Sequence, residues 1–306
     1  MLKTTVITLH YGSSQILYGV SVEAQIGKIT CIMGSNGVGK TSLLRVLSGT
    51  HPSSSGSYFL GDKEVTNCRA DFLAKSGVAY VPQGRFIFPM LTVRENLETG
   101  FACLNSNEHV IPDDIYTLFP ILKRMLDRRG GDLSGGQQQR VGIARSLAVE
   151  PDIWFLDEPF SALDPLIRKE MQDEFLRLQS VLNKTIMFVT HDFDEALRLA
   201  DRIAIMKDGI IEQLDKPDNI VLNPATDYVK RFTEDVPREK VLKIESIMDG
   251  VDPNASSDFA ISKSEIIETV AEKILNSKEI IKVTDENNNI VGSINPSKVI
   301  KVLFGG

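Results

Sequence analysis

A glycine-rich run has the residue types and spacing best suited to chemistry in this sequence. It fits the pattern G-x-x-x-x-G-K-[ST]. Glycines let backbone N–H groups surround a phosphate at a helix N-terminus, where the helix dipole favours an anion. We therefore predict a nucleoside triphosphate site, with Lys40 at the β- and γ-phosphates and Thr41 as a ligand of Mg²⁺. The residues expected at the nucleotide are Gly34, Ser35, Asn36, Gly37, Val38, Gly39, Lys40, Thr41 and Ser42.

The flanks of this run supply the structural context that the motif needs. Residues 28–33 predict a buried strand, and residues 42–47 predict the first turns of an apolar helix. Strand, glycine loop and helix follow one another as a phosphate-binding loop requires. The alternative is an ordinary glycine-rich turn, which is disfavoured because several fixed features of the motif coincide in this context.

Two adjacent carboxylates, Asp157 and Glu158, follow the apolar run 152–156, which predicts a strand. At the mouth of a parallel strand the two groups can divide the work. Asp157 would hold the Mg²⁺ shell and Glu158 would polarise the attacking water. The plainer alternative for both is helix capping or a salt bridge.

Gln83 and His191 each follow a predicted strand, at residues 78–81 and 185–190. The ends of strands are where α/β sheets collect catalytic groups. Gln83 is placed to touch Mg²⁺ or the attacking water and to respond to the loop beyond it. Taken alone, Gln83 would more often be a surface amide and His191 a structural histidine.

A second anion-binding arrangement is predicted at Ser134-Gly135-Gly136-Gln137. Ser134 is a good N-cap, so its hydroxyl and two glycines stand at a helix N-terminus. Simple capping is the alternative. Upstream of the phosphate loop, Tyr11 is either an aromatic that stacks on adenine or an ordinary half-buried tyrosine.

The elements that must position these residues alternate between strands and helices, which predicts an α/β fold. Residues 85–129 have helical spacing and predict a helical insertion. The 306 residues, 42% of them hydrophobic, suffice for a large domain and a small one. No stretch approaches the roughly 18 apolar residues of a membrane span, and the first residues predict a strand instead of a signal peptide.

Charge and cysteine content exclude other classes of protein. The formal net charge is −7 and no basic run is present, which argues against a nucleic-acid partner. The cysteines Cys31, Cys68 and Cys103 are scattered and lack metal-ligand spacing, which suits a reducing cytoplasm.

Together, these pieces resemble the ATP-binding cassette (ABC) of membrane transporters, in the family's order, over about residues 1–235. The corresponding positions are the A-loop Tyr11, the Walker A loop from Gly34 to Thr41, the Q-loop Gln83, the signature from Leu133 to Gln137, the Walker B Asp157, the catalytic base Glu158, the D-loop from Ser161 to Asp164, and the switch histidine His191.

The resemblance implies a fold and an oligomeric state. The fold is a P-loop NTPase with a RecA-like core, an antiparallel β subdomain and a helical subdomain at about residues 85–150. In the family, one subunit's signature covers the ATP held by the other subunit's Walker A loop, so hydrolysis requires a homodimer. Asp164 belongs to the expected nucleotide contacts.

The resemblance also implies the catalytic roles. Glu158 activates water, His191 steadies the γ-phosphate, and Gln83 links closure of the dimer to a membrane permease. Thr41, Gln83 and Asp157 are the expected Mg²⁺ ligands. The implied cofactors are ATP and Mg²⁺. The implied location is the cytoplasmic face of the inner membrane, where the protein binds peripherally to integral permease subunits. A periplasmic binding protein delivers the substrate to those subunits.

Within the family, residues 160–174 and 190–196 are similar to importers of glycine betaine, choline and related quaternary amines. Residues 34–41 and 80–85 are closer to importers of urea and branched-chain amino acids. Cassettes for taurine-like compounds or lipid trafficking are further alternatives. A rival from another class is a soluble ABC protein acting on ribosomes or DNA, but this chain has one cassette and no charged linker.

Beyond about residue 235 the sequence predicts a small α+β unit, residues 236–306. Ser262 and Glu265 fit a capping box, ahead of a helix with Ile266, Val270 and Ile274 on one face. A hairpin and a closing helix follow. This order resembles a single cystathionine-β-synthase-type (CBS) module, which implies regulation by ionic strength or a nucleotide, or dimerisation.

Overall fold

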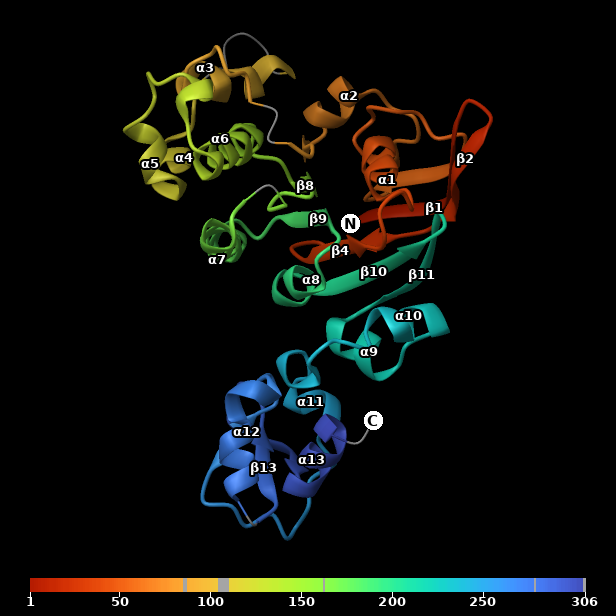
Figure 1. Cartoon of the computed structure of the whole chain (residues 1–306), viewed down its shortest axis with the longest axis vertical. Coiled ribbons are helices and arrows are strands. Elements are labelled where there is room, and N and C mark those ends of the chain that lie inside the picture. The colour runs from red at the N-terminus through yellow and green to blue at the C-terminus, as the bar shows by residue number, and fades with distance from the viewer. Residues whose placement is uncertain (85–86, 104–109, 162, 278, 305–306) are drawn as a thin grey trace. The chain divides into compact units, whose positions relative to one another are not determined.

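The computed structural model describes residues 1–84, 87–103, 110–161, 163–277 and 279–304. The chain divides into two units, Met1–Leu214 and Asp215–Gly306 (Figure 1). We expected the division near residue 235. It lies earlier because Leu222 packs against the core of the second unit, and because Asp218 accepts a hydrogen bond from the Ser246 hydroxyl of the same unit.

The N-terminal strands of the first unit form an antiparallel sheet. Its central strand β1 pairs with β2, β3 and β5. Buried and exposed side chains alternate at its start, where Leu2 and Thr4 face the core. The members are β1 (Leu2–Tyr11), β2 (Ser14–Val20), β3 (Glu23–Ala24), β5 (Ser55–Leu60) and β6 (Lys63–Glu64).

A six-stranded sheet carries the chemistry of the first unit, in the order β11-β10-β4-β9-β8-β7. From β10 to β7 neighbouring strands are parallel. Strands β4, β8 and β9 are buried at every position, as expected for a parallel sheet covered on both faces. The strands are β4 (Ile29–Met33), β7 (Val78–Val81), β8 (Ile153–Asp157), β9 (Thr185–Thr190), β10 (Arg202–Lys207) and β11 (Ile210–Asp215).

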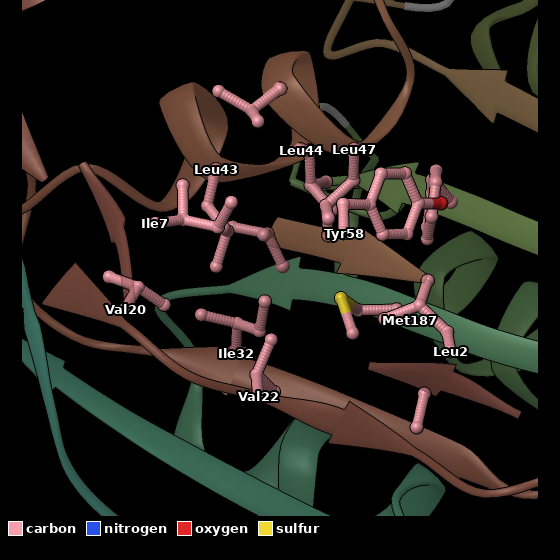
Figure 2. Packing of buried hydrophobic residues seen from close by; sticks show 14 of the residues in the cluster. Leu2, Ile7, Val20, Val22, Ile32, Leu43, Leu44, Leu47, Tyr58 and Met187 are labelled. Atoms are coloured by element: carbon pink, nitrogen blue, oxygen red, sulfur yellow. The ribbon is translucent and has the colours of Figure 1, made fainter. Parts of the chain in front are cut away.

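Helix α1 (Lys40–Leu47) joins the two sheets through the main core. Its Leu43, Leu44 and Leu47 are fully buried. Figure 2 shows them among Ile7 and Tyr58 of the antiparallel sheet and Ile32 and Met187 of the parallel sheet. Burial of each leucine contributes about 2 kcal/mol. This packing fixes the first turn of α1, and with it the end of the glycine loop.

The segment between β7 and β8 is helical, as the sequence predicts. In Figure 1 its helices group together on one side of the first unit. They are α3 (Val93–Glu98), η1 (Thr99–Cys103), α4 (Asp113–Leu118), α5 (Pro120–Lys123), η2 (Gly130–Asp132) and α6 (Gly135–Leu147). The remaining helices of this unit are α2 (Ala70–Lys75), α7 (Pro165–Leu182) and α8 (Phe193–Leu199).

The second unit has its own core and a three-stranded sheet, β12-β13-β14. Strand β12 is parallel to β13, and β13 is antiparallel to β14. The elements are α9 (Pro217–Leu222), α10 (Asp227–Phe232), η3 (Arg238–Lys240), α11 (Ile244–Ile247), β12 (Ala260–Ser262), α12 (Ile267–Asn276), β13 (Ile281–Thr284), β14 (Ile290–Ile294) and α13 (Pro296–Phe304).

The predicted capping box of this unit is wrong in one respect. Ser262 belongs to β12, and the N-cap of α12 is Ile266, which makes no side-chain cap. Glu265 does accept a hydrogen bond from the Ser262 N–H, at 2.9 Å. That contact turns the chain from strand to helix, so the buried face of α12 begins at Ile267 instead of Ile266.

None of the described helices, in either unit, has the length and apolar character needed to cross a membrane.

Candidate functional site

The glycine loop runs from the end of β4 to the start of α1, where the sequence placed it. Gly34 has φ 150°, and a Cβ there would lie 2.1 Å from the Met206 carbonyl oxygen. Gly39, the N-cap of α1, has φ 105°. Both positions require glycine, because a side chain would clash at the first and strain the backbone at the second.

Lys40 lies inside this loop, with only 5% of its surface exposed. Its Nζ donates to the carbonyl oxygens of Gly34 and Ser35, both at 2.8 Å. Burial lowers the pKa of Lys40, and the negative charges of Glu158 and Asp157 oppose that shift. A buried cation at a helix N-terminus is an electrostatic site for phosphate.

Asp157, the last residue of β8, lies next to the loop. The Thr41 hydroxyl donates to its Oδ1 at 3.1 Å, and the Tyr80 hydroxyl donates to its Oδ2 at 3.3 Å. Burial raises the pKa of Asp157, while the hydrogen bonds from Thr41 and Tyr80 lower it. The two hydrogen bonds therefore favour the ionised carboxylate that a metal ion needs.

Glu158 is held in a left-handed conformation, φ 45°, by the strand end. Its N–H donates to the Val189 carbonyl at 3.0 Å. Gln83 Nε2 donates to its Oε2 at 2.8 Å, and His191 Nδ1 lies 3.3 Å from its Oε1. The three predicted catalytic side chains therefore meet at one carboxylate, because β7, β8 and β9 are parallel neighbours that end at the same sheet edge.

A cavity of about 460 Å³ opens above these groups. Its size falls within the range of small-ligand sites. The residues that line it are Ile16, Asn36, Gly37, Gly39, Lys40, Thr41, Ser42, Gln83, Glu158 and His191. Nine of these ten are predicted site residues, so the structure brings them together around one cavity. The tenth, Ile16, was not predicted.

Tyr11 is not among the residues that line the cavity. Its ring meets His51 edge-on, with ring centroids 4.7 Å apart, and packs against the main core. Ile16, five positions along the chain, lines the cavity instead. No sequence signal distinguished Ile16 from any other half-buried aliphatic residue. The contact of Tyr11 with adenine remains a prediction.

The second predicted anion site caps helix α6. Ser134 N–H donates to Gln137 Oε1 at 2.9 Å, and Gln137 N–H donates to the Ser134 hydroxyl at 3.4 Å, a complete capping box. Ser134 is exposed and does not line the cavity. The structure of one chain therefore does not bring the Ser134 to Gln137 segment to the glycine loop.

The D-loop leads into helix α7. Asp164 Oδ1 accepts from the Ile167 N–H at 3.1 Å and caps that helix. Arg168, one turn further on, donates to the Leu163 carbonyl and lies 3.7 Å from Asp192. Ala162 lies outside the described residues. Asp164 is thus placed as a cap here, and its contact with nucleotide remains a prediction.

Glu195 lies in α8, just after the switch histidine, and is a buried acid that the predicted mechanism does not use. It is 5% exposed, and its Oε1 accepts a hydrogen bond from Gln172 Nε2 at 3.2 Å. Burial is the main cause that raises its pKa, and the nearby Asp192 adds to it. The folded state therefore holds the Glu195 proton more tightly than the unfolded state does.

Replacing Glu195 by glutamine is expected to change the pH dependence of stability. The wild-type chain loses stability as the pH rises from the ordinary glutamate pKa of 4.5 through the raised folded value. Glutamine cannot ionise and so avoids this loss. At a pH above the raised pKa of Glu195, the free energy of unfolding of the variant should therefore exceed that of wild type. At a pH below 4.5 the two should be equal. Urea denaturation at several pH values measures this, with the exposed Glu170→Gln as control; a difference independent of pH would contradict it.

Comparison with known proteins agrees with the site. A family model described as "ABC transporter" matches residues 17–161. A nucleotide-free ATP-binding cassette from an ABC transporter superposes with a TM-score of 0.67 at 25% identity, covering 76% of this chain and 98% of that one. The post-hydrolysis dimer of the cassette MJ0796, bound to ADP and Pi, has a TM-score of 0.62 at 28% identity and covers 71% and 98%.

Similar proteins of known role indicate which group of ABC proteins this chain resembles. The ATP-binding protein TmoW of the trimethylamine N-oxide transport system of Pelagibacter ubique is 55% identical over 292 residues, 93% of this chain and 85% of that protein. The carnitine transport ATP-binding protein OpuCA of Listeria monocytogenes is 34% identical over 312 residues, 98% of this chain and 76% of that protein. This chain belongs to the ABC transporter ATPases and is an enzyme that binds and hydrolyses ATP. Among them, it groups with subunits of small methylated-amine import systems.

Proposed function

We propose that this chain energises the uptake of trimethylamine N-oxide or a related methylated amine, such as glycine betaine, carnitine or choline. The hydrolytic half of the proposal is supported by the contacts of Glu158 with Gln83 and His191 beside a buried Lys40. The substrate half is supported by the 55% identity with TmoW. The similarity of residues 34–41 and 80–85 to importers of urea and branched-chain amino acids covers only a few positions, whereas the identity with TmoW extends over 292 residues.

The arrangement of the three side chains suggests how hydrolysis proceeds. Glu158 accepts a proton from the water that attacks the γ-phosphate. Gln83 and His191 hold both of its oxygens, which orients the base. Lys40 neutralises the phosphate charge that the carboxylates of the site would otherwise repel.

We propose Mg²⁺ as the metal, held by Thr41, Asp157 and Gln83. These supply oxygen donors, which a hard cation prefers. The described residues contain no group of three or more His, Cys, Asp or Glu side chains that would form a complete metal cage. That fits Mg²⁺, which binds through one or two carboxylates, waters and substrate phosphates. When bound, the ion would neutralise charge on the phosphates.

We propose further that two chains sandwich two ATP molecules, with Ser134 of each covering the nucleotide of the other. In support, Ser134 is exposed at a capped helix N-terminus, away from the cavity of its own chain. The dimer would bind permease subunits at the cytoplasmic face of the membrane, and a periplasmic binding protein would deliver the substrate to them.

Ser134→Arg tests the dimer. The bulky cation should prevent ATP-dependent dimerisation while ATP binding to a single chain stays within about twofold of wild type, because Ser134 does not line the cavity. Light scattering in the non-hydrolysing Glu158→Gln background measures dimerisation, and Ser180→Arg, at another exposed serine, is the control. A dimer of normal stability in Ser134→Arg would overturn the proposal.

The transport function is tested in proteoliposomes that contain this chain and its co-purifying permease. Uptake of trimethylamine N-oxide, glycine betaine, carnitine, choline, urea and leucine is compared with ATP inside the vesicles. We expect ATP-dependent uptake of at least one methylated amine and none of urea or leucine. Uptake of urea or leucine alone, or co-purification with ribosomes, would refute the proposal.

For residues 236–306 we propose a CBS-like regulatory or dimerisation module. Its support is the succession β12-α12-β13-β14-α13 around a separate core. Because Leu222 belongs to that core, truncation is best placed before α9, after residue 214. If truncation changes neither the salt dependence of ATP hydrolysis nor dimerisation, the module has no such role.

A further inference from the structure

Tyr80 is a residue that the assigned catalytic machinery does not include, yet it contacts that machinery. It lies in β7, three positions before Gln83, and its ring packs partly against the main core. The Tyr80 hydroxyl donates a hydrogen bond to Asp157 Oδ2 at 3.3 Å. No part of the fold requires a hydroxyl there, because a phenyl ring would fill the same space.

The hydrogen bond from Tyr80 fixes the orientation of the Asp157 carboxylate because the other oxygen of that carboxylate also accepts a hydrogen bond. Thr41 donates to Oδ1 at 3.1 Å, so each carboxylate oxygen has its own donor. Rotation of a carboxylate about χ2 is otherwise broad. Two donors on opposite oxygens define the plane of the group. Mg²⁺ demands a nearly ideal octahedral geometry, so the plane of a ligating carboxylate affects how well it binds the ion.

Arg45 places a positive charge near the Tyr80 hydroxyl. It follows Thr41 by four positions in α1, so both side chains leave the same face of that helix. Burial raises the pKa of Tyr80 and Asp157 raises it further, while the guanidinium of Arg45 opposes them. A carboxylate only accepts, so the Tyr80 hydroxyl directs its proton to Asp157 Oδ2.

We propose that Tyr80 is a positioning residue that holds Oδ2 of Asp157 and leaves Oδ1 to the metal ion. When a metal–nucleotide complex draws the Thr41 hydroxyl away, Tyr80 is the donor that continues to fix the carboxylate. This inference rests on the proposed Mg²⁺ site and adds a residue to it that touches neither nucleotide nor metal.

The experiment compares Tyr80→Phe with Tyr58→Phe. The Tyr58 hydroxyl is buried and has no hydrogen-bond partner in the described structure, so its removal is a matched control. Both variants are made in the full chain with Glu158→Gln to prevent turnover. Binding of a fluorescent ATP analogue is measured in EDTA, and the dissociation constant of Mn²⁺ from the ATP-loaded chain is measured by electron paramagnetic resonance.

We expect Tyr80→Phe to bind ATP normally in EDTA and to bind Mn²⁺ about tenfold more weakly, as is usual when a group that orients a metal ligand is removed. Tyr58→Phe should match the parent chain in both assays. Unchanged Mn²⁺ affinity in Tyr80→Phe would overturn the inference. A loss of ATP affinity in EDTA as large as the loss of Mn²⁺ affinity would also overturn it, because it would indicate a purely structural role. If the ATP-loaded parent chain binds Mn²⁺ no more tightly than free ATP does, the proposed Mg²⁺ site itself is refuted.

Discussion

Replacing Glu158 by glutamine is expected to slow ATP hydrolysis by at least about 100-fold, because general-base catalysis contributes a factor of about 10² to 10⁴. The amide keeps an oxygen and an NH₂ at nearly the same positions but cannot accept the proton of the attacking water. ATP binding should stay within about threefold of wild type, since Lys40 and the glycine loop, the groups that we expect to contact phosphate, are unchanged.

Initial rates of phosphate release at saturating ATP measure this effect, and equilibrium binding of a fluorescent ATP analogue measures affinity. The control is Glu150→Gln, at an exposed glutamate in the loop before β8, which should hydrolyse ATP at the wild-type rate. A Glu158→Gln chain that hydrolyses ATP normally would remove Glu158 from its role. Loss of binding as well would mean that the variant disturbs the loop.

Replacing Lys40 by alanine should weaken ATP binding by about 10- to 100-fold. Hydrogen bonds to charged groups contribute about 1.5 to 3 kcal/mol each, which corresponds to that range of affinity. Lys40 is buried in the loop and is held by the carbonyls of Gly34 and Ser35, so its charge is poorly screened and already oriented.

The matched control for Lys40 is Lys28, which lies just before β4, the strand that leads into the glycine loop. Lys28 is exposed and forms a surface salt bridge with Asp201 at 3.4 Å. Such pairs contribute little, so Lys28→Ala should bind ATP as wild type does. Isothermal titration of the nucleotide separates the two cases. Equal affinities of Lys40→Ala and wild type would show that the loop does not hold the phosphates through this lysine.

The sequence predicted correctly those features that depend only on residues close together in the chain. Strand, glycine loop and helix at residues 29–47 follow from hydrophobic pattern and glycine placement over a few residues. The Ser134 N-cap of α6 follows for the same reason, since it depends on hydrogen bonds between residues three positions apart. These features needed no knowledge of the rest of the chain.

Errors occurred where packing outweighed local signals. The pattern at Ser262 and Glu265 fits a cap, but pairing of β12 with β13 kept Ser262 in a strand. The boundary near residue 235 follows a change in composition. The structure divides after Leu214 because the apolar side chain of Leu222 is buried in the core of the second unit.

By itself, the sequence determined which chemical groups this ATPase has: a phosphate loop, a pair of carboxylates, a glutamine and a histidine, each at a predicted strand end. Only the tertiary structure decided that Gln83 and His191 meet on Glu158, that Ile16 lines the cavity, and that Tyr80 holds Asp157. The reason is physical. Residue types and local spacing follow from the order of the chain, whereas contacts between residues on different strands depend on which strands become neighbours in the sheet.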